Sequence, residues 1–133
     1  MATSIPFGKI NEILARWAAN TPPIEDFTVE NVLYAVGLDS SYYEIILRFL
    51  MSKAGFELIP KKMLVCPSNH KIQAFDLDED LEGELFDCFC GESDFEAEDF
   101  ILVFSFTDDF KKDALALKKK FMKNQEQRYL QLV

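Results

Sequence analysis

Three cysteines and the single histidine of this 133-residue chain lie close together in the sequence. Cys66 and His70 form a Cys-x3-His pair, and after seventeen intervening residues Cys88 and Cys90 form a Cys-x-Cys pair. Three thiols and one imidazole are a complete ligand set for one tetrahedral zinc ion. Because protein side chains would fill all four positions, none stays open for a catalytic water. The sequence therefore predicts a structural zinc site.

Other interpretations of these residues stay open. Free cysteine behaves as a small buried hydrophobe, so a site that has lost its metal fits the same pattern. A Cys88–Cys90 disulfide would close a very small, strained ring. A cysteine nucleophile would need His70 as its base, and no third residue marks that pair out. Since there is also no phosphate-binding glycine loop and no spare histidine, we expect a non-enzymatic protein, with a cysteine or metal enzyme as a further alternative.

Three amphipathic helices are predicted in the first half of the chain. Apolar residues recur at helical spacing in residues 7–20, 29–36 and 41–54. Thr28 is a suitable N-cap for the second helix, and Gly37 ends it. The short segment between the second and third helices is typical of a helix-turn-helix connection.

The second half predicts strands and one long helix. Strand patterns occur at residues 63–65, 72–75 and 84–89. Residues 100–106 form a continuous apolar run, which predicts a strand buried on both faces. A long helix is predicted over residues 108–130. The fold class is therefore α+β, with a three-helix unit, a small antiparallel sheet and a C-terminal helix.

Three helices followed by a β-hairpin resemble the element order of winged-helix proteins. The words Cys66-Pro-Ser-Asn-His70 and Cys88-Phe-Cys-Gly91 resemble the two knuckles of a zinc ribbon. The resemblance is divergent, because a standard knuckle is Cys-x-x-Cys, whereas His70 lies one position late and the second pair is one residue short. It implies a winged-helix-like unit over residues 1–60, a zinc-ribbon-like β unit over 61–107 and a C-terminal helix over 108–133, in one compact domain. Its first functional implication is DNA binding.

The net charge of −9 is concentrated in one segment, which we call the acidic stretch, residues 75–99. It has no basic residue and twelve acidic ones, namely Asp76, Asp78, Glu79, Asp80, Glu82, Glu84, Asp87, Glu92, Asp94, Glu96, Glu98 and Asp99. Such negative charge repels phosphates and argues against binding to duplex DNA. It favours a docking surface for a basic protein partner, with a solvated loop or a DNA-mimic inhibitor as alternatives.

We therefore expect an adaptor or regulatory subunit that binds other proteins, and the alternative is a winged-helix nucleic-acid-binding regulator. The lysine-rich C-terminal helix is a candidate for self-association. The sequence contains no run of eighteen apolar residues, so it predicts no membrane span, and we expect no membrane partner. Unpaired cysteines without a signal peptide predict a cytoplasmic protein.

Overall fold

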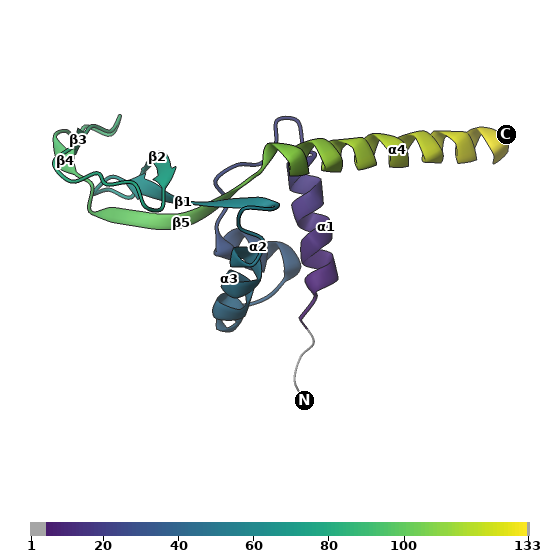
Figure 1. Cartoon of the computed structure of the whole chain (residues 1–133), viewed down its shortest axis with the longest axis horizontal. Coiled ribbons are helices and arrows are strands. Elements are labelled where there is room, and N and C mark those ends of the chain that lie inside the picture. Colours follow the sequence, from purple (N-terminus) through teal and green to yellow (C-terminus); the bar gives the residue numbers. More distant parts are fainter. Residues whose placement is uncertain (1–4, 133) are drawn as a thin grey trace.

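The computed structural model describes the backbone of residues 5–132 and the side chains of residues 5–123 (Figure 1). The molecule is elongated, with a helical unit in its middle part. A long β-ribbon leads from this unit to one end, where it carries the β lobe, residues 66–98. The last helix, α4, projects toward the opposite end (Figure 1). The fold is α+β, as the sequence predicts.

The helical unit consists of α1 (Phe7–Ala18), α2 (Val29–Val36) and α3 (Tyr43–Met51). Thr28 caps α2 with a reciprocal capping box, in which its hydroxyl accepts the Asn31 N–H and the Asn31 side chain accepts the Thr28 N–H. Gly37 ends α2 with a φ of 73°, which glycine adopts without strain. The expected third helix begins as the short 3-10 helix η1 (Ser40–Tyr42) before it becomes α-helical.

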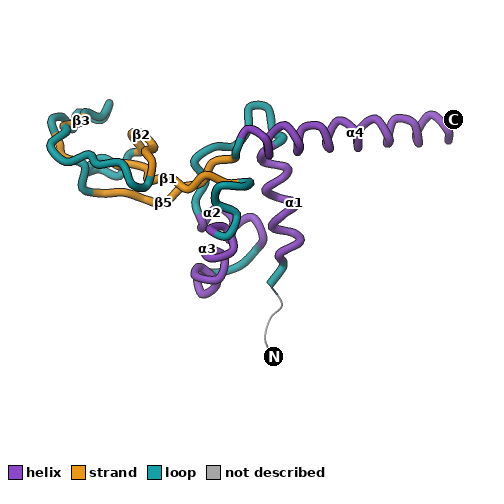
Figure 2. The backbone as a smooth tube through the Cα atoms, viewed as in Figure 1, coloured by secondary structure: helices purple, strands orange, loops and turns teal. Residues whose placement is uncertain are grey.

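The main sheet contains β1 (Leu58–Val65), β2 (Lys71–Asp76) and β5 (Asp99–Phe106), in the order β2-β1-β5, and its neighbouring strands are antiparallel (Figure 2). A second ladder joins β3 (Leu85–Phe86) to β4 (Phe95–Glu96). Phe27, in the connection between α1 and α2, pairs with Phe104 through two backbone hydrogen bonds of 3.0 and 2.8 Å. The free edge of β5 is therefore partly covered by a segment from the helical unit.

The hydrophobic core lies where α1, α2 and α3 meet the helical end of the ribbon. Ile10 and Leu14 of α1 are buried there beside Phe104 of β5. The ring of Trp17 packs edge-on against Phe27, with 5.3 Å between the ring centroids. The single tryptophan of the chain therefore lies against the helical core, far along the chain from the β lobe.

Two strand predictions need correction. Residues 100–106 are predicted to be buried on both faces, but Ile101 is 36% exposed, because it lies on the face of β5 opposite Phe104 and Phe106, and the helices cover only the face of those two residues. In the predicted strand at residues 84–89, β3 covers Leu85–Phe86, because the following residues form a tight turn. The short partner strand β4 was not anticipated. β1 continues across residue 60, where the first predicted unit ends, and the division into three units stays a prediction.

The last helix, α4 (Asp108–Leu132), begins where β5 ends. The Thr107 hydroxyl accepts the Phe110 N–H at 3.3 Å, which caps the first turn. Ala114 is buried against the core, whereas Leu117 is 66% exposed. Arg128 and Tyr129, which the sequence assigns to this helix, lie outside the residues whose side chains are described. Among the described residues, no helix combines the length and the apolar character needed to cross a membrane.

Candidate metal centre

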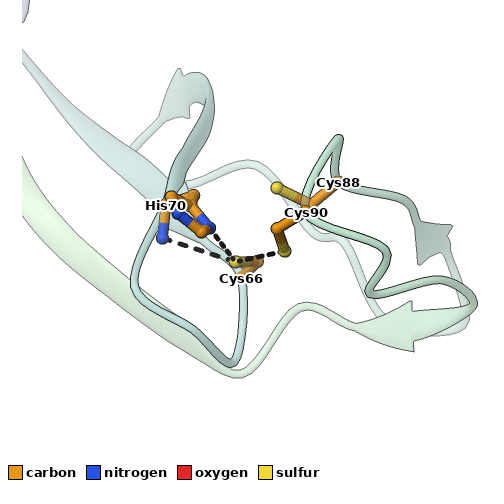
Figure 3. Close-up of side chains that lie close together, drawn as sticks. All are labelled: Cys66, His70, Cys88 and Cys90. Carbon is orange, nitrogen blue, oxygen red and sulfur yellow. Dashed lines mark hydrogen bonds between the residues drawn. The ribbon is translucent and has the colours of Figure 1, made fainter.

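The structure brings the four predicted ligand residues together from two hairpin connections. Cys66 directly follows β1 and His70 directly precedes β2, whereas Cys88 and Cys90 lie between β3 and β4. The ligand atoms of all four residues lie within 4.8 Å of one another (Figure 3). Three cysteines and one histidine could therefore hold a metal ion at this point.

The two connections share one backbone geometry, although their sequences differ. In the first, the Cys66 N–H donates to the His70 carbonyl at 2.9 Å and the Asn69 N–H donates to the Cys66 carbonyl at 2.8 Å. In the second, the equivalent bonds join Cys88 to Glu92 at 2.8 Å and Gly91 to Cys88 at 3.1 Å.

The fourth residue of each turn has a positive φ, 68° at Asn69 and 103° at Gly91. Asparagine and glycine are the residues that adopt this conformation most readily. His70 supplies its ligand from the fifth position of its turn, whereas Cys90 supplies its ligand from the third position. This difference explains the unequal spacing of the two pairs, because similar turns present ligands from different positions.

The distances within the cluster suit a single tetrahedral ion. The Sγ atoms of Cys66 and Cys90 are 3.8 Å apart, and the Cys66 Sγ is 3.3 Å from the His70 Nδ1. A tetrahedral ion about 2.3 Å from each sulfur holds two sulfurs about 3.8 Å apart. All three cysteines are free thiols, and their separation is well beyond the roughly 2.05 Å of a disulfide bond.

The surroundings of Cys66 favour its thiolate, the form that binds metals. Burial raises the pKa of the Cys66 thiol. Hydrogen bonds from the backbone of His70 and Ser68, and from the side chains of His70 and Cys88, outweigh this effect and lower the pKa to about 7. A hydrogen bond from the backbone N–H of Cys90 lowers the pKa of the Cys88 thiol. Burial and the neighbouring sulfurs of Cys90 and Cys66 raise it by more, so the pKa of Cys88 is raised overall. Cys66 is therefore the thiol of this pair that ionises first.

The cluster lies at the surface, with one protected ligand. Cys66 is buried and Cys88 is half-buried, whereas His70 and Cys90 are exposed. Cys66 also accepts the His70 backbone N–H on its sulfur at 3.3 Å, which fixes the direction of the Sγ atom. Four protein ligands around one point would fill all four coordination positions of a tetrahedral ion. This arrangement is typical of structural metal sites.

The β lobe has little hydrophobic core of its own. Within residues 66–98, all of which are described, Cys66 and Leu81 are the two buried residues. The rings of Phe75, Phe86 and Phe95 form a half-buried row, with centroid distances of 5.9 and 6.3 Å between neighbours. Small units with so few buried apolar residues are commonly held together by a metal, a disulfide or association with another chain. The cluster provides the ligands for such a metal.

The surface of the lobe combines negative charge with exposed apolar side chains. All twelve carboxylates of the acidic stretch are exposed. Leu77, Leu85 and Phe89 are exposed beside them, at 45%, 58% and 111% respectively. The sequence pattern does not distinguish these three from the packed apolar residues of the stretch. The exposure of Phe89 could have been predicted from its position between Cys88 and Cys90. When two ligands face the same ion, the side chain between them tends to point outward.

Comparison of the chain with protein-family models, with curated proteins and with solved structures finds no match.

Proposed function

We propose that this protein is a non-enzymatic adaptor or regulatory subunit, whose β lobe binds a basic surface of another protein. The observation that carries the proposal is that all twelve carboxylates are exposed on a lobe whose two ligand-bearing turns meet at one point. Charge of one sign on a rigid support speeds association with an oppositely charged partner and excludes partners of like charge.

We propose zinc as the metal and a structural role for it. Three thiolates and one imidazole suit zinc, which accepts these ligands in tetrahedral geometry. The ion would join the β1–β2 connection to the β3–β4 connection, as the ion of a zinc ribbon joins two knuckles. Its function would be to hold the acidic surface in one shape, because the lobe buries few side chains of its own.

We further propose that the helical unit is a winged helix whose wing is replaced by the β lobe. The pairing of Phe27 with Phe104 supports this view, because it adds a short strand from between the first two helices to the edge of β5. The resulting order, β1 then β5 then the Phe27 segment, is the sheet expected for a winged helix. The lobe then occupies the long connection between β1 and β5.

The third helix favours a protein partner over duplex DNA. A helix that reads DNA presents several basic or amide side chains to base edges and phosphates. The exposed face of α3 carries Glu44, Ile45, Arg48 and Met51, and Arg48 lies 3.8 Å from the Glu44 carboxylate. The other cation near its end, Lys53, pairs with Glu57 at 2.9 Å. Such a face offers little positive charge to a phosphate backbone.

The test is affinity capture with quantitative mass spectrometry, using variants matched in charge. The lobe variant is Glu82→Lys with Glu84→Lys, and the control is Glu25→Lys with Glu30→Lys, all at exposed positions. A protein retained by the wild type and the control but lost with the lobe variant supports the proposal. It should then be purified and titrated against each form.

The proposal is wrong if every captured protein binds both variants equally. It is also wrong if the purified chain binds duplex DNA at low salt and Arg48→Ala removes this binding, since the nucleic-acid-binding alternative would then hold.

A further inference from the structure

The turn between Cys88 and Cys90 holds an aromatic side chain fully in solvent. Phe89 is 111% exposed, the highest exposure among the large apolar residues of the described chain. Its two neighbours are candidate metal ligands, and the Asp87 carboxylate accepts the Asp94 N–H at 3.0 Å across the base of the turn. A phenyl ring on a turn fixed at both sides loses little entropy when it is buried by a partner.

An apolar hollow lies at the opposite side of the helical unit, in the corner between α1 and α4. The volume of this open hollow is about 690 Å³, which is in the range of pockets that accept small molecules or side chains. Its apolar lining comes from both helices and consists of Ala15, Ala19, Ala114, Leu117, Phe121 and Met122. The last three side chains are 66%, 61% and 55% exposed, so the hollow is uncovered.

The charges around these two features are opposite. Phe89 lies within the acidic stretch, between Asp87 and Glu92. Arg16 and Lys118 border the hollow, with Glu12 as its one acidic lining residue. Residues 114–123 of α4 carry four lysines and no acidic residue, so the segment of α4 that lines the hollow is positive.

The two features cannot meet within one molecule. The β lobe and α4 extend from the helical unit in opposite directions, with the β1–β5 ribbon between the lobe and the helices (Figure 1). The eight residues of β1, at about 3.3 Å each, place the first ligand turn roughly 25 Å from Leu58, which is buried in the helical core. A complementary pair at two opposite ends of the molecule therefore requires a second copy.

We infer that the protein self-associates by inserting Phe89 of one copy into the α1/α4 hollow of another. The contact joins two different surfaces, so it is heterologous and forms either a reciprocal pair with two contacts or a longer chain. An aromatic anchor in a desolvated apolar pocket supplies most of the affinity, and the surrounding opposite charges orient the two copies. The inference goes beyond the proposed adaptor function, because it requires no other protein.

Sedimentation velocity of purified protein over a range of concentrations tests this contact. The wild type should associate, and Phe89→Ala and Phe121→Glu should each weaken association at least about tenfold. An equimolar mixture of the two variants should form a 1:1 complex, because one intact ring then meets one intact hollow. Tyr34→Ala is the matched control, since Tyr34 is 90% exposed on α2, away from both surfaces.

Zinc content and Trp17 fluorescence report whether each variant is folded. Folded wild type that stays monomeric at all concentrations overturns the inference. So does Phe89→Ala protein that associates as the wild type does, because α4 alone would then form the contact. The purified protein contains no adaptor partner, so neither result bears on the capture experiment.

Discussion

Removal of the proposed zinc ion is expected to unfold the β lobe while the helical unit keeps its structure. The perturbation is a chelator, or the single substitution Cys88→Ser, which removes one of the four ligands. Ser68→Ala is the matched control, because Ser68 lies in the first ligand turn but contributes no side-chain ligand.

The expected size of the effect follows from what the lobe buries. Complete burial of Leu81 stabilises the lobe by about 1.5–3 kcal/mol, and each of the two aromatic contacts adds about 0.5–1.5 kcal/mol. Structural zinc in small domains contributes about 10–16 kcal/mol. A bound zinc ion would therefore be the larger contribution, and the remaining contacts do not offset the conformational entropy of ordering the lobe.

Hydrogen exchange followed by mass spectrometry measures both parts of the molecule at once. Peptides from residues 66–98 should lose protection when the metal is removed, whereas those from α1, α2 and α3 should keep it. Trp17 fluorescence should not change, because Trp17 packs on Phe27 in the helical unit and the lobe contains no tryptophan. Unchanged protection of the lobe after complete metal removal would refute the reasoning, and so would simultaneous unfolding of the helices.

Three further predictions concern the metal and the helical unit. Metal affinity should decline as the pH falls, because protonation of a ligand thiolate expels the metal. Cys66, whose pKa is lowered to about 7, takes up its proton as the pH falls through about 7, and Cys88, whose pKa is raised, does so at higher pH; competition with a chromophoric chelator measures this, and a pH-independent affinity would contradict it. Leu50→Ala, at a fully buried position in α3, should cost about 2–5 kcal/mol in urea unfolding monitored through Trp17, without loss of zinc from the folded protein. Thr28→Ala should cost about 1 kcal/mol in the same assay, because the Asn31 N–H loses its capping partner, and an effect below about 0.3 kcal/mol would show that this cap contributes little.

Local patterns in the sequence were sufficient for the helices and for the identity of the ligand residues. The start of α2 is determined by Thr28 and its end by Gly37, and both act within one turn of chain. Cys66 and His70, and likewise Cys88 and Cys90, are separated by at most three residues, so each pair was recognisable without knowledge of the fold.

Contacts between distant segments decided the burial of the strands. The apolar run of β5 does not reveal that Phe104 packs into the helical core, whereas Val103 packs against Met63 and Val65 on the other face of the sheet and Ile101 stays partly exposed. The pairing of Phe27 with Phe104 joins residues from opposite halves of the chain, and no local pattern encodes such a pair.

The sequence by itself determined which side chains could bind a metal and where the negative charge lies, because residue identity and short spacing are local properties. The tertiary structure alone decided that the two ligand pairs meet at one point, with Cys66 buried and Cys90 exposed. It also decided that Phe89 and the α1/α4 hollow lie on opposite sides of the molecule. These facts depend on the length and direction of the β1–β5 ribbon, which arise from pairing between residues about forty positions apart.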